Sequence, residues 1–340
     1  MKISDNKIAN SIYMMASLVV VFAGMKMASN LVVPFLLALF ISLISMPLLN
    51  FLREKKINAT LSVSLVLTTI VVLGLGIAAI IGSSLNSFRM SLPEYKDRIY
   101  LVLENLVSFA NKNDINVDME NILNYMDPAF VLPFIADTLS AFGNVLTNFV
   151  LIIFIVMFIL LEASSFKSKL IKAFKKDSKY MKNIDIFSKN INKYIAIKTI
   201  ISMITGLLVF IMLYSIGVDY AILWGVTAFF LNYIPNIGSI IASVPAIILS
   251  LIQFDVYYAF LVAIGYLLIN IIMGNIIEPR YLGKELGLST LVVFISLIFW
   301  GWLLGPVGMI LSIPLTMIIK IGLENYDDTK WLAIILSRKV

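Results

Sequence analysis

The chain has 340 residues, of which 60% are hydrophobic and 14% charged, and its mean hydropathy is +0.97. Soluble domains carry roughly a quarter charged residues, so this composition excludes a soluble globular protein and predicts a membrane protein. The sequence contains no cysteine and no histidine. These absences exclude disulfides, thiolate nucleophiles and cysteine zinc sites and remove the usual general base. We therefore expect no enzyme, no cofactor and no metal site.

About six uncharged stretches predict transmembrane helices, because a bilayer core about 30 Å thick requires roughly 20 apolar residues. The first stretch is short and ends at Lys26, whose side chain can reach the interface. A signal peptide is the alternative for it, but no convincing A-x-A cleavage site follows. The six stretches are Ser11–Met25, Leu31–Leu52, Ala59–Gly82, Thr138–Leu161, Thr199–Val218 and Val256–Ile277.

Two further uncharged stretches, Tyr220–Phe254 and Leu286–Ile319, are too long for one crossing and short for two. Glycine and proline interrupt each near its middle, where a helix cannot continue undisturbed. We therefore expect two broken helical hairpins, either re-entrant or barely spanning. The expected hinge or tip residues are Pro235 and Gly238 in the first hairpin, and Gly301, Gly305, Pro306 and Gly308 in the second.

The charges of the loops predict the orientation of the chain. Basic residues gather before the first span, after the second and in the lysine-rich segment 162–198, whereas segment 83–137 is acidic. By the positive-inside rule, the N- and C-termini are then cytoplasmic, provided each hairpin returns to the side from which it enters. The two hairpins would enter from opposite sides. Such inverted, interrupted segments are typical of secondary transporters with a site near the midplane.

The predicted organisation has five parts along the chain. They are N-terminal transmembrane helices (1–82), an extracytoplasmic helical insertion (83–137), a transmembrane helix (138–162), a basic cytoplasmic amphipathic insertion (163–198) and a C-terminal transport core with both hairpins (199–340).

In the outer insertion, the apolar seam of Leu92–Phe109 predicts an amphipathic helix, and a second short helix is expected at Met119–Tyr125. Three roles are open for the helix Leu92–Phe109: it packs on the extracellular ends of the spans, forms a contact between protomers, or covers the transport pathway. The inner lysines suit lipid headgroups, and no pattern indicates nucleic acid.

Polar residues near the end of the sixth span are candidates for the transport pathway, because polar groups at membrane depth are expensive. Asn270 and Asn275 lie inside or at the end of this span, and Glu278 follows where Pro279 stops the helix. Glu278 either binds a proton, a cation or a polar solute, or pairs locally with Arg280 at the cytoplasmic interface.

The tip of the first hairpin provides the other polar candidates. Asn232, Tyr233 and Asn236 surround its proline, where an opened helix leaves backbone groups free. These groups either bind a ligand or satisfy one another. Two lysines near the spans, Lys198 and Lys320, are interpreted as cytoplasmic helix ends.

The C-terminal third also contains two long motifs, LNYIPNIGSIIASVP (231–245) and NIIEPRYLGKELGLSTLVVFISLIFWGWLLGPVGMILSIPL (275–315). The second has the form N-x-x-E-P-x-x-x-G-x-x-x-G-L-S, followed by G-x-x-x-G-x-x-G and a proline. With these motifs the chain resembles the autoinducer-2 exporter (PerM-like, AI-2E) family of bacterial membrane proteins. One departure is Ser289-Thr290, where the family often has Ser-Pro.

The resemblance implies an all-α polytopic transporter of the bacterial cytoplasmic (inner) membrane. It implies a homo-oligomer, with a pentamer as the expected arrangement, and export of the quorum-sensing signal autoinducer-2, a small polyhydroxylated solute. Some relatives are described as sodium or lithium/proton antiporters, so the resemblance leaves the substrate open.

Three hypotheses follow, all with membrane lipids as partners. The first is an exporter that works by alternating access, with the solute bound by Asn232, Tyr233, Asn236, Asn270 and Asn275. The second is a monovalent cation/proton antiporter that uses Glu278. The third is a non-transporting scaffold or receptor that docks through its outer helix.

Overall fold

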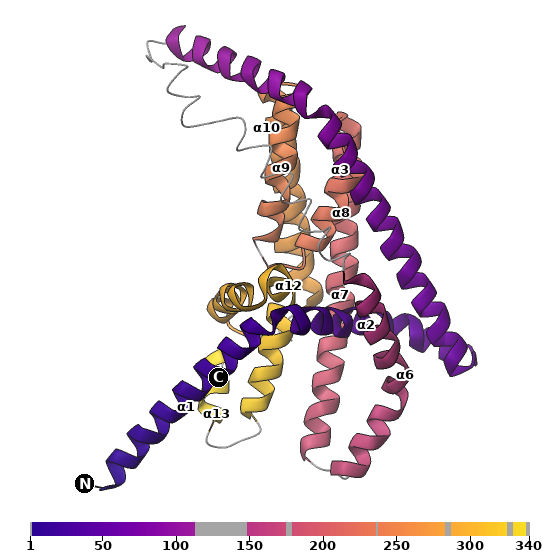
Figure 1. Ribbon diagram of the computed structural model, residues 1–340, viewed down its shortest axis with the longest axis vertical. Helices are drawn as coiled ribbons and strands as arrows, with labels where there is room; N and C mark the ends of the chain where they lie inside the picture. The colour runs from indigo at the N-terminus through magenta and orange to yellow at the C-terminus, as the bar shows by residue number, and fades with distance from the viewer. Residues whose placement is uncertain are drawn as a thin grey trace. The chain divides into compact units, whose positions relative to one another are not determined.

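In a computed structural model of the chain, the described residues are 2–112, 148–174, 179–235, 237–282, 287–324 and 329–337. These residues are almost entirely helical, as Figure 1 shows. Within these ranges the only extended pairing is an isolated β-bridge between Leu288 and Ser337. Helices satisfy their own backbone groups, which is what a bilayer requires. The predicted all-α class is therefore confirmed for the part of the chain that is described.

Several of these helices are long and apolar enough to cross a membrane. Among the described residues, five meet this criterion: Ser29–Glu54, Ala59–Ser91, Ser188–Ile216, Val256–Tyr281 and Thr290–Glu324. Shorter apolar helices cover Ala16–Met27, Phe149–Ala163, Ala221–Leu231 and Gly238–Gln253. The chain is thus a polytopic integral membrane protein. Six full crossings with two re-entrant hairpins stay a prediction.

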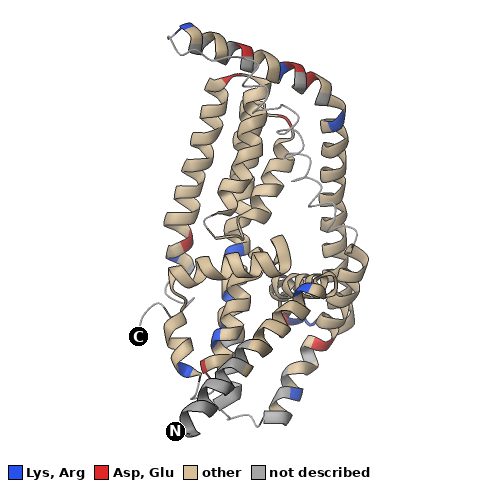
Figure 2. Ribbon diagram, turned by 60° about the vertical axis from the view of Figure 1, so that its left-hand side comes forward, with Lys and Arg blue, Asp and Glu red and all other residues tan. Residues whose placement is uncertain are grey.

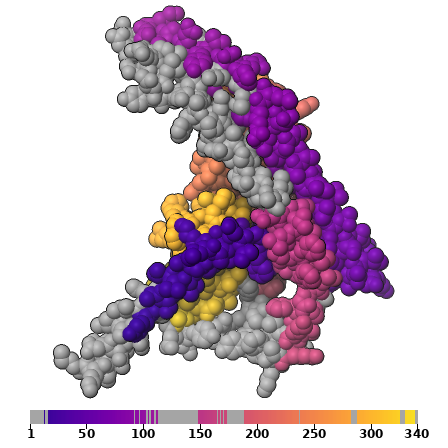
Figure 3. Space-filling model, viewed as in Figure 1, coloured from indigo at the N-terminus to yellow at the C-terminus, as the bar shows by residue number. Residues whose placement is uncertain are grey.

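The helices fall into two compact units that alternate along the chain. Unit 1 comprises Met1–Val63, Leu151–Asn192 and Lys284–Val340, and unit 2 comprises Ser64–Val150 and Lys193–Gly283. In unit 1, α12 (Thr290–Glu324) packs against α1 (Lys2–Met27), α2 (Ser29–Glu54) and α13 (Lys330–Leu336). Figure 3 shows the indigo surface of the first two helices lying over the yellow C-terminal helices. Most of α6 (Phe149–Phe174) also belongs to this unit.

Unit 2 contains the long helices around the first hairpin. These are most of α3 (Ala59–Lys112), the second part of α7 (Lys179–Ile216), α8 (Ala221–Leu231), α9 (Gly238–Gln253), α10 (Val256–Asn270), the π-helix η1 (Ile271–Ile277) and α11 (Glu278–Leu282). Helix α9 packs between α8 and α10, which stand beside it in Figure 1. Buried Phe88, Leu213, Trp224, Leu249 and Val262 belong to one apolar core.

Both predicted helix breaks are present. The first separates α8 from α9 at residues 232–237. The second lies at Gly305 inside α12, with φ 66° and ψ −153°, a conformation that favours glycine. Beyond this break the two arms touch, because Trp300 Nε1 donates to Thr316 Oγ1 at 3.0 Å and a Cβ on Gly308 would overlap the Trp300 carbonyl. Entry of the hairpins from opposite sides of the membrane stays a prediction.

Helix α3 runs unbroken over 54 residues, across the expected boundary between the membrane helices and the outer insertion at residues 82 and 83. This boundary stays a prediction. Tyr95 and Ile99 continue the apolar seam of α3 into the core of unit 2, so packing keeps the chain helical past Pro93. Its charged residues gather toward the C-terminal end (Figure 2). The expected helix at 119–125 and the start of the span at 138 lie outside the described residues.

Candidate functional site

A stripe of polar side chains on α7 forms one wall of the candidate site. Lys198, Ser202 and Thr205 follow one another at helical spacing, and their exposed fractions are 2%, 0% and 4%. Ionisable residues that face inward from a membrane helix are functional candidates by default. Lys198 was interpreted as a cytoplasmic helix end, but in the structure it lies in the middle of α7 (Lys179–Ile216) and is buried inside unit 2.

Lys198 is held by an ion pair with Glu278. Its Nζ donates to both carboxylate oxygens of Glu278, at 2.6 and 2.7 Å. The side chains of Lys198 and Glu278 are 3% and 19% exposed. The alternative partner Arg280 is exposed, and among the described residues no ion pair joins it to Glu278. The local pairing considered for Glu278 is thus replaced by a buried pair that links α7 to the start of α11.

The π-helix η1 brings Glu278 into this position. Buried residues on α10 recur every three or four positions, as at Val262 and Tyr266, and the same face continues at Met273. In a regular α-helix the next residue on this buried face would be Ile277. Here, however, the backbone N–H of Glu278 donates to the Met273 carbonyl, five residues back. The wider turn moves Glu278 onto the buried face. π-helical segments are rare and frequently accompany functional sites.

The tip of the first hairpin is hydrogen-bonded to the same face of α7. Asn232 Nδ2 donates to Ser202 Oγ at 2.9 Å, and Tyr233 OH donates to Thr199 Oγ1 at 2.8 Å. Asn232 and Tyr233 are 7% and 3% exposed. In this state the Asn232 amide N–H and the Tyr233 hydroxyl are paired within the protein, so a ligand would have to take over these bonds.

The other predicted site residues are distributed differently. Asn275, Pro279 and Arg280 are exposed, Asn270 is half-buried, and Asn236 lies outside the described residues. Pro235 is half-buried in the tip, and Gly238 is buried there. Gly238 packs so closely against Leu231 that a Cβ at this position would overlap the Leu231 carbonyl oxygen. The remaining hinge residues, Gly301, Gly305, Pro306 and Gly308, form the second hairpin in unit 1. Within unit 2, the structure therefore brings Asn232, Tyr233 and Glu278 against α7, where their partners are Ser202, Thr199 and Lys198.

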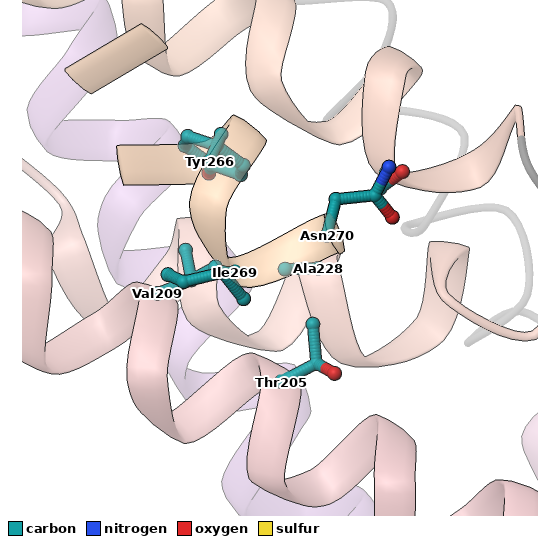
Figure 4. A pocket seen from close by; sticks show the side chains of 7 residues that line it. Thr205, Val209, Ala228, Tyr266, Ile269 and Asn270 are labelled. Atoms are coloured by element: carbon teal, nitrogen blue, oxygen red, sulfur yellow. The ribbon is translucent and has the colours of Figure 1, made fainter. Parts of the chain in front are cut away.

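A small cavity continues the site along α7. Its volume is about 10 Å³, and it is lined by Thr205, Val209, Ala228, Ser239, Tyr266, Ile269 and Asn270 (Figure 4). This space holds about one water molecule. The sequence interpretation included Asn270 but missed Tyr266, Thr205 and Lys198. Their signal was the helical spacing of Tyr266 with Asn270, and of Lys198 with Ser202 and Thr205.

A second polar cluster holds the other end of the first hairpin. Tyr95 OH donates to Asp219 Oδ2 at 2.7 Å, and Arg98 Nη1 donates to the Gln253 carbonyl at 2.7 Å. The Asp219 N–H donates to Gln253 Oε1 at 3.0 Å. Burial, with the hydrogen bonds to Tyr220 and Asp219, raises the pKa of Tyr95 above its usual range. The residues before α8 and at the end of α9 are thereby fastened to each other and to α3.

Comparison with known proteins identifies the family. Residues 15–328 match the AI-2E family transporter. The AI-2 transport protein TqsA of Escherichia coli K12 is 40% identical over 96% of this chain and 95% of its own length. A Haemophilus influenzae protein is 39% identical over 95% of the chain and 94% of its own length. The E. coli protein YhhT is 34% identical over 95% and 93%. The Haemophilus influenzae protein and YhhT are both named putative transport proteins, and neither name specifies a solute. The chain therefore belongs to the AI-2E transporter family.

Proposed function

We propose that the chain exports a small, neutral, polyhydroxylated solute such as autoinducer-2. The observation that carries the proposal is the neutralised pair of Lys198 and Glu278 beside a row of hydroxyl and amide side chains. The pair has no net charge, so the site offers hydrogen bonds rather than an attraction for ions. The similarity to a relative named as an AI-2 transport protein supports this class of solute.

The exchange of hydrogen bonds provides a mechanism for opening. Asn232 and Tyr233 bond Ser202 and Thr199 when the hairpin tip lies against α7. A solute with several hydroxyl groups can replace each of these bonds with one of its own, so separation of the tip leaves no polar group unpaired. Alternating access then follows from movement of the hairpin tip against α7, with ligand binding favouring the open state.

The proposal includes the setting of the protein. The charge pattern of the loops supports the bacterial cytoplasmic membrane with both termini in the cytoplasm. We propose a homo-oligomer, with five protomers as the expected number, surrounded by membrane lipids. Crosslinking of the full-length protein in native membranes, followed by mass analysis of the complexes, measures this number.

One observation favours a second function, exchange of a monovalent cation for protons. The ammonium group of Lys198 already occupies the position beside the Glu278 carboxylate that a bound cation would take. A sodium ion could take the place of that ammonium group if the lysine moved away, and Glu278 would then alternate between bound cations. The buried position of Lys198 makes its displacement expensive, which is why solute export ranks first.

Flux in proteoliposomes distinguishes these functions. We expect wild-type protein to move autoinducer-2 at a rate that does not depend on an imposed sodium or proton gradient. Glu278→Gln should slow this flux, whereas the matched change Glu104→Gln, at an exposed site on α3, should not. No movement of autoinducer-2 would contradict the export proposal. Sodium-coupled proton movement by the wild-type protein would establish the antiporter instead.

The role of the hairpin tip is tested in the same vesicles. Asn232→Ala removes a side chain that bonds Ser202 in the closed state and is proposed to bond the solute in the open state. We expect a flux at least tenfold lower, because loss of one good hydrogen bond to a ligand is worth about 1.4 kcal/mol. Asn111→Ala, at an exposed position of α3, is the matched control. Equal flux in both variants would remove Asn232 from the pathway.

A further inference from the structure

An open groove runs along one face of α12 in unit 1, and its volume is about 310 Å³. The residues that line it are all apolar: Ile295, Ile298, Phe299 and Trp302. They recur at steps of three and four, so they follow one another along the helix over about 10 Å. Ile298 and Trp302 are each 57% exposed, so the described part of the chain leaves the groove open. An apolar groove parallel to a membrane helix suits a hydrocarbon chain.

A lysine stands beside the end of this groove. Lys26, near the C-terminal end of α1, places its Nζ 3.9 Å from the centroid of the Trp302 ring. One turn earlier on α1, Phe22 packs edge-to-face against Phe299, with the ring centroids 4.9 Å apart. These two aromatic contacts hold the end of α1 against α12 within unit 1. They thereby fix the ammonium group next to the apolar groove.

The ammonium group of Lys26 has no counter-charge within the described ranges. There it forms no ion pair and donates no hydrogen bond, and its contact is the face of the Trp302 ring. The ring attracts one side of an ammonium group that carries three N–H donors. In the predicted orientation Lys26 follows the first span on the outer side, where the positive-inside rule disfavours a lysine. The remaining donors therefore favour an anion as a partner.

We propose that the groove and Lys26 together form a binding site for an anionic phospholipid. One acyl chain lies along the groove, and the headgroup phosphate accepts hydrogen bonds from the Lys26 ammonium group. A phospholipid with a net negative charge is preferred, because its phosphate has no cationic group of its own to pair with. The inference does not depend on which solute the protein transports.

Charge complementarity selects the lipid over other occupants. An apolar helix from a second copy of the chain would fill the groove but leave Lys26 without an anion. A soluble anion would pair with Lys26 but leave the apolar residues uncovered. An anionic phospholipid supplies the hydrocarbon chain and the charge in one molecule, and the bilayer provides it in excess.

Quenching of tryptophan fluorescence by brominated lipids tests the site, because bromine quenches a tryptophan that it contacts. The full-length protein is placed in phosphatidylcholine vesicles that contain a minor fraction of brominated phosphatidylglycerol or brominated phosphatidylcholine. Each protein is compared with its Trp302→Phe counterpart, so that the difference reports Trp302. We expect half-maximal quenching at an about fivefold lower content of phosphatidylglycerol, which corresponds to about 1 kcal/mol for one lysine near an anionic lipid.

Three variants test the role of the charge. Lys26→Gln should abolish the preference for phosphatidylglycerol, whereas Lys26→Arg should keep it because the positive charge remains. Lys55→Gln is the matched control and should also keep it, since Lys55 is an exposed lysine over another aromatic ring, 5.7 Å from the centroid of Phe51. Glycerol phosphate, a headgroup without acyl chains, should not displace the brominated lipid.

Several results would overturn the proposal. Equal quenching by both lipids in the wild-type protein would show an ordinary lipid annulus. A preference that persists in Lys26→Gln would place the attracting charge elsewhere. Absence of quenching by either lipid would show that protein, such as a second copy of the chain, covers the groove. Displacement by glycerol phosphate would show that Lys26 binds a soluble anion and that the groove holds no acyl chain.

Discussion

Replacement of one partner of the buried ion pair should destabilise the protein more than replacement of both. Glu278→Gln leaves the Lys198 ammonium without its counter-charge at a position that is 3% exposed. Lys198→Met leaves the Glu278 carboxylate, whose side chain is 19% exposed. The double variant Lys198→Met, Glu278→Gln leaves neither charge. The order of stability should therefore be wild type close to the double variant, then Lys198→Met, then Glu278→Gln.

The magnitude follows from the burial of the stranded charge. Removal of one partner of a buried pair typically lowers the free energy of unfolding by about 3–5 kcal/mol, whereas replacement of both is often neutral. Lys198 is the more deeply buried partner, so Glu278→Gln should lie near the upper end, at about 4–5 kcal/mol, and Lys198→Met near about 3 kcal/mol. The double variant should stay within about 1 kcal/mol of wild type, a coupling of several kcal/mol between the two sites.

Reversible unfolding in mixed detergent micelles measures these differences, with helix content and tryptophan fluorescence as two probes. The exposed pair of Lys169 and Glu162 provides the control, since their side chains are 65% and 54% exposed. The corresponding double-variant cycle at that pair should show almost no coupling, because water and salt screen it. If the two single changes at Lys198 and Glu278 were additive in the double variant, the buried pair would not exist and the reasoning would be refuted.

Tyr95→Phe should lower the free energy of unfolding by about 1 kcal/mol, because it removes the hydrogen bond to Asp219 while water can still reach that carboxylate. Burial raises the pKa of Tyr95 above 10.0, so the folded state keeps its proton longer than the unfolded state. Stability should then fall as the pH rises past about 10, and Tyr95→Phe should flatten that part of the pH profile. Gly238→Ala should lower stability by about 1–3 kcal/mol, because its Cβ would overlap the Leu231 carbonyl oxygen. Gly76→Ala, with nothing within 4 Å of the added Cβ, should be close to neutral in the same thermal assay; equal effects would contradict the close packing of the hairpin tip.

Hydropathy predicted the helices of this chain well because a bilayer leaves the backbone little alternative. It also located both helix breaks, since Pro235 and the Gly305-Pro306 pair disturb the helix locally. The unbroken course of α3 was not predictable in this way. Its continuation depends on the contacts of Tyr95 with Asp219 and with the core, which lie far away in sequence.

The candidate site was predicted only in part. The sequence indicates how far along each membrane helix a charged residue lies, but not which face of the helix its side chain occupies. Hydropathy shows that Lys198 and Glu278 lie near the ends of apolar stretches, and there a charged side chain can always be assigned to the interface. Whether it does reach the interface depends on which face of its helix it occupies. For Lys198 the spacing to Ser202 and Thr205 already indicates a shared polar face, which the charge pattern of the loops obscured.

Glu278 was harder to place, because regular helical spacing from Met273 predicts that Ile277 continues the buried face. The segment 271–277, IIMGNII, contains no proline or charge that would mark a wide turn. Its π-helical hydrogen bond from Glu278 to the Met273 carbonyl adds one residue to the turn, and the carboxylate then meets Lys198. A π-turn loses regular helix geometry, so it persists where a tertiary contact compensates for that loss. The ion pair is such a contact. The register of this helix is therefore decided by a partner 80 residues earlier in the chain, and no local pattern could reveal it.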